Sequence, residues 1–354
     1  MRAIAFSQGG YNPREPVFYP YGEGDEVKIV RQSGGGRYDA RTPKFALTPT
    51  VKRRYVLIWL AVGALGLGLI ALPGFAQTRP SEQSAPEVSA GDGDLFSRVI
   101  ANQKRVDAEL NVYERVERVE IRKTGSDPNP SEVKVWRVFP AGTGMSKIPL
   151  TAEAKPASAE SYRAALEKLQ TTLIWAAETG PAQREAYAKV ERRKKERDDL
   201  IDSTRKAFVF TKIGEEIRGN RTLVKYKMAR NPAFKPATRN EMLFSKVRGT
   251  LWIDRETSEL AKIEGEVTED ITLALFLAKV YRGSYFMQER YEMAPGVWLP
   301  TYQQYDFDGR KFVVPFSIHE RAFYTQYRRV GPPSEAVEAV RGELNKLGEN
   351  RADP

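Results

Sequence analysis

The stretch LFSKVRGTLWIDRETSELAKIEGEV, residues 243–267, alternates apolar and charged side chains on both sides of a polar loop. Before the loop, Leu251 and Ile253 fall in one phase. After it, one phase is apolar or small and the other is charged: Ala261, Ile263, Gly265 and Val267 against Lys262, Glu264 and Glu266. Successive side chains of a strand point to opposite faces, so the pattern predicts an antiparallel hairpin with one apolar face. Asp254 can close its turn by accepting backbone N–H bonds.

The strand rhythm of this hairpin extends from about Phe208 to about Tyr327. Gly219 and Asn220 mark a tight two-residue turn, and APG and DG turns separate three later strand-like runs at residues 285–329. An earlier hairpin is expected from strand-like runs on either side of the SDPNP turn, at about 113–121 and 132–140.

Three local features modify this strand pattern. The apolar run Leu273–Ala278 fits either two turns of buried helix or a short strand, and its periodicity does not choose between them. Pro315 indicates an edge strand or a bulge, because proline cannot donate to a neighbouring strand. A change of phase between Tyr302 and Tyr305 predicts a bulge near Gln303 and Gln304.

Three segments have helical periodicity. Asp94 can cap a helix over 95–110, with Leu95, Val99, Val106 and Leu110 as its apolar stripe. The segment 157–206 is predicted to be a helical hairpin inserted into the sheet, and its run KVERRKKERDD is typical of a solvated helix face. The tail 331–354 begins with prolines and is expected to form a loosely docked amphipathic helix.

The start of the chain indicates export. Residues 55–72 carry no charge and follow a basic flank, Lys52 to Arg54. This pattern fits a signal peptide over 51–76 that is cleaved after Ala76. It also fits an uncleaved anchor that contacts the membrane through residues 55–72. The small residues before the cleavage point favour the signal peptide. We therefore expect a periplasmic protein, or alternatively one anchored in the inner membrane and facing the periplasm.

Two further segments flank this apolar run. Residues 1–50 show no period that could bury a face, so they are expected to be a disordered extension, or an artefact of a misassigned start with translation from Val51. Residues 77–93 are rich in Pro, Ser and Gly and are expected to be a linker to the domain at 94–330.

Composition excludes several functions. The net charge of +10 is divided evenly between the first 54 residues and the rest of the chain, where both signs are interleaved, so no nucleic-acid footprint is indicated. The chain has no cysteine and a single histidine, His319, which reads as structural. With no catalytic or metal-binding motif, the sequence predicts a protein that is not an enzyme and needs no cofactor or metal.

Aromatic side chains are dense in the last strands of the predicted sheet, between Tyr281 and Phe316. Collectively they suit a concave apolar surface, and such hollows commonly bind apolar ligands. Eight residues are predicted to line it: Leu251, Ile253, Ile263, Val267, Tyr305, Phe307, Phe316 and Ile318.

Two stretches, RGTLWIDRETSELAKIEGEV and VWLPTYQQYDFDGRKF, carry a family likeness. A strand ending in Ile-Asp, a short polar loop, a return strand and a later Trp-Leu-Pro strand, Trp298 to Pro300, resemble the periplasmic outer-membrane lipoprotein-sorting superfamily, which includes the Lol-type carriers. The resemblance covers about 95–329, apart from the helical segment 157–206. It implies an α+β fold: an antiparallel, unclosed half-barrel wrapped around helices, with a cavity for an acyl chain or apolar peptide.

The leading hypothesis is thus an exported envelope protein that binds a lipid or a lipoprotein acyl chain in a half-barrel cavity, with a role in lipoprotein sorting or lipid carriage. An alternative is a structural or sensory protein whose sheet and inserted helices bind another envelope protein. A hydrolase using paired carboxylates such as Glu264 and Glu266 ranks last.

Overall fold

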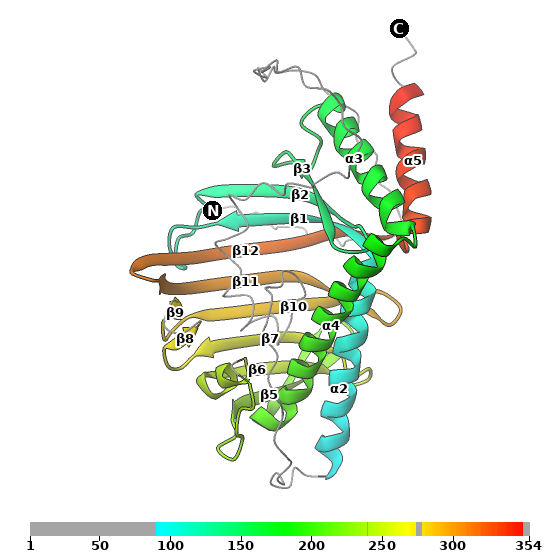
Figure 1. Ribbon diagram of the computed structural model, residues 1–354. Coiled ribbons are helices and arrows are strands. Elements are labelled where there is room, and N and C mark those ends of the chain that lie inside the picture. The colour runs from blue at the N-terminus through cyan, green and yellow to red at the C-terminus, as the bar shows by residue number, and fades with distance from the viewer. Residues whose placement is uncertain (1–89, 239, 274–277, 350–354) are drawn as a thin grey trace, which may run out of the picture. The chain divides into compact units, whose positions relative to one another are not determined.

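The computed structural model describes residues 90–238, 240–273 and 278–349 (Figure 1). The predicted extension, the signal peptide or anchor and nearly all of the linker fall on residues 1–89, outside this part. No helix among the described residues combines the length and the apolar character needed to cross a membrane.

Twelve strands in the described residues form one antiparallel sheet, in the order β3-β2-β1-β12-β11-β10-β7-β6-β5-β4, with β9 beside β11 and β8 beside β9. The outermost strands of this order, β3 and β4, are not paired with each other in the described chain, so the sheet is an unclosed half-barrel, as predicted. The strand bounds are β1 Tyr113–Ile121, β2 Glu132–Pro140, β3 Met145–Leu150, β4 Phe208–Arg218, β5 Arg221–Arg230, β6 Val247–Asp254, β7 Leu260–Val267, β8 Ile271–Leu273, β9 Ala278–Val280, β10 Tyr285–Ala294, β11 Val297–Lys311 and β12 Val314–Arg329.

The hairpin expected from residues 243–267 is β6 and β7, paired with Leu251 opposite Ile263. Asp254 is fully buried, and its carboxylate accepts backbone N–H bonds from Glu256 and Thr257, which closes the loop as predicted. Gly265 is required by a close approach: a Cβ there would lie 2.5 Å from the ring of Phe286 on β10. A side chain at position 265 would therefore require the Phe286 ring to move.

The two faces of the sheet are covered by different helices. We call the face that carries Leu251, Ile263 and Tyr305 the inner face, and the face that carries Trp252 and His319 the outer face. Helices α2 (Ala90–Glu109) and α4 (Pro181–Ala207) pack on the inner face over β4 to β7. Helices α3 (Ala159–Ala177) and α5 (Pro333–Glu349) pack together on the outer face at the β2–β3 end (Figure 1).

The helical segment 157–206 consists of α3 and α4, but the two helices diverge after Gly180. Leu166, Leu169 and Leu173 of α3 are fully buried against α5, whereas α4 lies beside α2. Each helix therefore covers a different face of the sheet, and both contribute residues to the hydrophobic core.

Several boundaries differ from those expected. The strand β3 has no counterpart in the predictions, and the short strands β8 and β9 flank residues 274–277, which lie outside the described part. The change of phase in β11 occurs between Pro300 and Tyr302, slightly before the predicted bulge. The tail helix α5 is well packed rather than loosely docked, since Val337, Val340 and Leu344 are buried against α3.

Candidate functional site

The inner face contains a small apolar hollow beneath α2 and α4. Its volume is about 50 Å³, which is room for a few water molecules, whereas pockets that hold small-molecule ligands usually measure ~300–1,000 Å³. The helices contribute most of its lining and the strands the remainder: Phe96, Val99, Ile100, Gln103, Ile201, Thr204, Arg205, Phe210, Met228, Leu251, Leu260 and Ile263. The hollow is therefore part of a cleft between two layers that are largely packed together.

All eight predicted lining residues belong to the hydrophobic core on this inner face. Leu251, Ile253, Ile263, Val267, Tyr305 and Phe307 are buried, and Phe316 and Ile318 are half-buried. Of the eight, Leu251 and Ile263 border the hollow. Contact between these eight residues and a ligand stays a prediction.

Sequence reasoning missed the helical part of the lining. The buried positions of α2 include Phe96, Val99, Gln103 and Val106, whereas Leu95 and Leu110 of the predicted stripe are half-buried. The rings of Phe96 and Phe210 stack with centroids 4.1 Å apart, which joins α2 to the edge strand β4. The spacing of Phe96, Val99, Gln103 and Val106 is itself helical, but glutamine in the stripe obscures it.

The aromatic residues of the last strands do not all face this hollow. Phe286, Tyr305 and Phe307 lie in the inner-face core, but Tyr285 and Tyr302 lie on the outer face. The Tyr285 hydroxyl donates a 3.1 Å hydrogen bond to Glu264, a polar neighbour on that face. The expectation that these aromatics collectively line one concave surface is therefore wrong for Tyr285 and Tyr302, because strand alternation sends them to the outer face.

A buried polar network lies between the helix layer and the sheet, next to the hollow. Arg290 on β10 is 2% exposed, and its Nη1 donates a 2.6 Å hydrogen bond to Oε1 of Gln103, a residue of the hollow's lining. Its Nη2 donates to Gln288 at 3.1 Å. On α2, Asp107 lies 2.9 Å from Nε of Arg197 on α4. These contacts tie both helices to one polar patch of the inner face.

Burial sets the protonation behaviour of this network. It raises the pKa of Asp107, although the charges of Arg197 and Arg290 act in the opposite direction. It also lowers the pKa of Arg290, against the favourable charges of Asp107 and Glu259. Glu259, which also pairs with Arg105 of α2, has its pKa raised by burial as well. Charged groups removed from water in this way are strongly coupled to one another.

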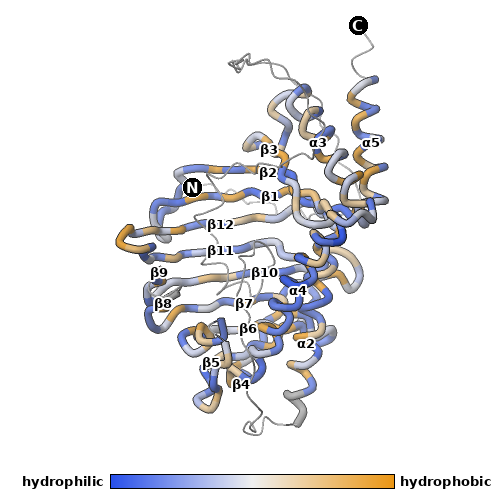
Figure 2. Tube along the Cα trace, viewed as in Figure 1, coloured by the Kyte–Doolittle hydropathy of each residue, from blue (hydrophilic) through white to orange (hydrophobic). Residues whose placement is uncertain are grey.

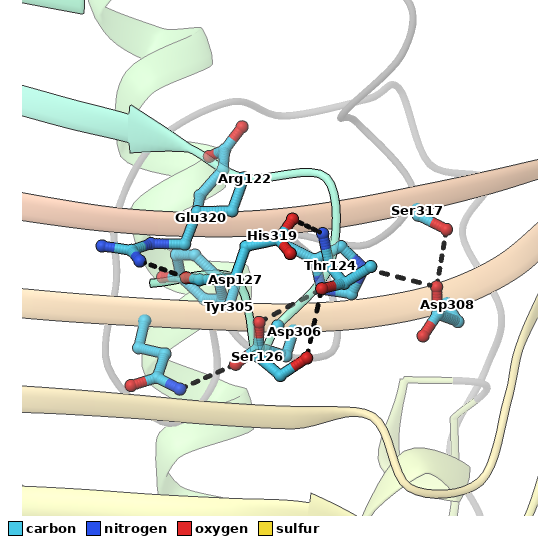
Figure 3. Close-up of polar contacts among 12 residues, drawn as sticks. Arg122, Thr124, Ser126, Asp127, Tyr305, Asp306, Asp308, Ser317, His319 and Glu320 are labelled. Atoms are coloured by element: carbon cyan, nitrogen blue, oxygen red, sulfur yellow. Dashed lines mark hydrogen bonds and ion pairs between the residues drawn. The ribbon is translucent and has the colours of Figure 1, made fainter. Parts of the chain in front are cut away.

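A second polar cluster occupies the outer face (Figure 3). His319 Nδ1 lies 3.1 Å from Asp306 Oδ1, and Arg321 donates to the same carboxylate at 3.0 Å. Arg321 also donates to the backbone oxygen of Gly125 in the β1–β2 loop, where a Cβ would lie 2.7 Å from Asp306 Oδ1. The cluster therefore fastens this loop to the sheet.

The side chains of this outer-face cluster bond mainly to one another and to the β1–β2 loop. Ser317 donates to Asp308 Oδ1 at 2.6 Å, and the same oxygen lies 3.6 Å from His319 Nε2 (Figure 3). Burial acts to raise the pKa of Asp306, but the hydrogen bonds from Arg321 and Gln304 outweigh it and hold that pKa below its usual value. No group of three or more His, Asp or Glu side chains in the described part of the chain has the geometry of a metal site.

A larger groove, of about 410 Å³, lies between the β1–β3 end of the sheet and helices α3 and α5. Arg137 in its wall donates to Glu114 at 2.8 Å and to Glu343 of α5 at 2.9 Å. Tyr162 of α3 donates to the same Glu343 at 2.7 Å. These groups satisfy one another, so the network holds α3 and α5 on the sheet and leaves no buried donor aimed at a ligand.

No protein-family model matches the chain, and no curated protein shows significant similarity to it. Among solved structures, a DUF1329 family protein from Desulfovibrio piger matches at 11% identity over 67% of this chain and 92% of its own, with a TM-score of 0.25. A protein described as an outer membrane lipoprotein-sorting protein domain, from Vibrio parahaemolyticus, matches at 9% identity over 66% and 92%, also with a TM-score of 0.25.

Proposed function

We propose that this protein is exported to the cell envelope and binds an apolar moiety, a lipid or a lipoprotein acyl chain, between the helix layer and the inner face of its half-barrel. The observation that carries the proposal is the apolar hollow bounded by α2, α4 and strands β4 to β7. The signal-like segment at 51–76 and the sequence resemblance to lipoprotein-sorting proteins point the same way. The more specific proposal is that the protein acts in lipoprotein sorting or lipid carriage.

The size of the hollow determines how binding must occur. At about 50 Å³ it cannot hold a long acyl chain, so α2 and α4 must move outward to admit one. Each methylene removed from water contributes ~0.8 kcal/mol, so about ten methylenes would contribute ~8 kcal/mol toward that opening. The polar contacts of Arg290 and Asp107, rather than apolar packing alone, oppose the movement.

The experiment is a titration of the purified protein with a fluorescent fatty acid, comparing Ile100→Trp with Ile174→Trp. Ile100 borders the hollow, whereas Ile174 is exposed on α3, so the same change of volume fills the cleft in one variant and points to solvent in the other. We expect affinity to fall about tenfold or more for Ile100→Trp and to stay unchanged for Ile174→Trp. Equal affinities in both variants, or no uptake by the wild type, would count against the proposal; mass spectrometry of lipid extracted from protein purified out of its native envelope identifies the ligand.

A second candidate function, binding of a protein partner, is favoured by the edge strand β4. Ile213 and Ile217 are exposed on it, and no strand of the described chain pairs with its outer edge. An exposed, apolar edge can accept an added strand from a partner. Ile213→Lys should abolish such a complex, detected by cross-linking in the envelope, and leave fatty-acid uptake intact. Deleting α3 and α4 would not distinguish the two functions, because Ile201 of α4 borders the hollow.

A further inference from the structure

The hairpin of β11 and β12 projects beyond the strands beside it. These are the longest strands of the sheet, with 15 and 16 residues. On one side, β1 ends at Ile121, opposite Glu320 of β12; on the other, β10 begins at Tyr285, opposite Asp306 of β11. In the described part of the chain only the three-residue strand β9 accompanies the hairpin further. From Ile318 to Val314, at ~3.3 Å per residue, the hairpin extends about 13 Å beyond β1 and β10, and β9 pairs with its β11 side as far as Lys311.

The tip of this hairpin is apolar and exposed. Phe312, Val313 and Val314 are 55%, 87% and 64% exposed. Figure 2 shows the turn between β11 and β12 in the hydrophobic colour, at the end of the hairpin that is far from α2. Three consecutive large apolar residues left in water at a projecting point are a feature of interaction sites.

The turn itself is built from residues that turns disfavour. Lys311 pairs with Val314, so Phe312 and Val313 form a two-residue loop. Phe312 adopts φ +53°, and a two-residue loop with positive φ at its first position prefers glycine there. Phenylalanine in the left-handed region is uncommon and strained. The turn therefore gains no stability from a phenylalanine at position 312. Contact of the ring with an apolar environment outside the protein accounts for this residue.

The charges around the tip indicate what kind of apolar environment it contacts. Arg310 and Lys311 are exposed immediately before the apolar residues, and the nearest carboxylate along β11, Asp308, accepts a hydrogen bond from Ser317. Apolar side chains that insert at the level of lipid headgroups, beside lysine or arginine attracted to anionic lipids, form the usual interfacial anchor. A stable protein partner would need about 800 Å² of this surface, more than three side chains on a two-stranded tip supply.

We propose that the tip formed by Arg310 to Val314 inserts into the surface of an anionic lipid bilayer. Phe312, Val313 and Val314 enter the headgroup region, and Arg310 and Lys311 contact the anionic headgroups. The tip and the β4–β5 turn lie at opposite ends of the strands. When the tip binds the bilayer, the β4–β5 turn therefore stays away from it. This inference does not depend on whether the inner-face cleft binds a lipid.

The test uses the full chain, which lacks cysteine and so can carry one reporter. Val314→Cys is labelled with a fluorophore sensitive to polarity and titrated with vesicles of phosphatidylcholine and phosphatidylglycerol in a 7:3 ratio, or of phosphatidylcholine alone. Ile217→Cys, exposed in β4 near the β4–β5 turn, is the matched reporter. We expect a blue shift at position 314 with the anionic vesicles, a much weaker response with the neutral ones, and none at position 217.

Two sets of tip variants complete the experiment in the Val314→Cys background. Phe312→Gly with Val313→Asn improves the turn and removes the anchor, so it should fold at least as well and lose the blue shift. Arg310→Glu with Lys311→Glu should raise the half-maximal vesicle concentration about tenfold or more. The inference is overturned if the blue shift at position 314 is absent or is equalled at position 217. It is also overturned if the shift at position 314 is the same with neutral and anionic vesicles, or is unchanged in the tip variants. A shift that self-association of the chain produces without vesicles would overturn it as well.

Discussion

Arg290 on β10 and Gln103 on α2 are joined by a 2.6 Å hydrogen bond between Nη1 and Oε1, although 187 positions separate them in the sequence. The contact lies at the border of the inner-face hollow, where Gln103 also forms part of the lining. It couples the position of the helix layer to the sheet. The stability of the closed arrangement should therefore depend on a polar group inside an otherwise apolar interface.

Replacing Arg290 with methionine should destabilise the protein by ~3 kcal/mol, because Asp107 and Glu259 would lose a buried countercharge. Adding Asp107→Asn should recover part of this loss, since the coupled groups are not additive. Urea denaturation of the two single variants and the double variant measures the coupling. Arg248→Met, which removes an exposed ion pair with Glu266, is the control and should cost less than ~1 kcal/mol. Strict additivity of Arg290→Met and Asp107→Asn would contradict the network.

The sheet could be predicted from the sequence, because alternation in residues such as Ala261 to Val267 records which face of a strand is buried. The buried role of Arg290 could not, because its partners come from distant parts of the chain and an arginine within a strand reads as exposed. The divergence of α3 and α4 was hidden for a similar reason. Both helices have amphipathic patterns, and a pattern does not specify which face of the sheet it will cover.

The candidate site was predicted in part. The phase of Leu251 and Ile263 places them on the inner face, and the structure has them bordering the hollow. The sides of Tyr285 and Tyr302 were not recognised: Tyr285 faces away from its neighbour Phe286 by strand alternation, and the bulge in β11 lies before Tyr302 rather than after it. One-residue shifts of this kind change which face a side chain occupies, and sequence periodicity locates them poorly.

Replacing Leu251 with alanine should destabilise the protein by ~2–5 kcal/mol, because it removes buried methyl groups and enlarges the hollow. The neighbouring Thr250→Ala is the matched control, since its side chain lies on the outer face and is half-buried. It should cost no more than ~1 kcal/mol. Thermal or urea unfolding measures both. If the hollow binds apolar ligands, a saturating fatty acid should restore more stability to Leu251→Ala than to Thr250→Ala, and equal restoration would place the ligand elsewhere.

Asp306 should contribute stability that depends on pH. Its hydrogen bonds from Arg321, Gln304 and His319 hold its folded-state pKa below the ordinary value of 3.8, despite partial burial. A depressed carboxyl pKa stabilises the fold above the ordinary pKa, and this contribution is lost as pH falls below about 4. Asp306→Asn should therefore cost ~1–3 kcal/mol at pH 7, and progressively less as the pH falls below 4. Melting temperatures between pH 3 and pH 7 measure this.

The control for Asp306 is Asp308→Asn, because Asp308 lies on the same strand and is largely exposed. It should change stability by less than ~0.5 kcal/mol at pH 7. A loss in Asp306→Asn that stays constant down to pH 3 would show that the carboxylate charge is not what fastens the β1–β2 loop.

Glu320 should behave in the opposite way. Burial on the inner face raises its pKa above 4.5, and the charge of Glu117 acts in the same direction, while Lys134 and Lys147 partly oppose them. A raised carboxyl pKa means that the folded state binds the proton more tightly than the unfolded state, so stability falls as pH rises from about 4.5 through the folded-state pKa. Glu320→Gln, which has no charge to bury, should therefore melt at a higher temperature than the wild type at pH 7, and the difference should vanish below pH 4. Glu132→Gln, an exposed position on β2, should show no such trend. A lower melting temperature for Glu320→Gln at pH 7 would mean that attraction to Lys134 and Lys147 outweighs the cost of burying the charge.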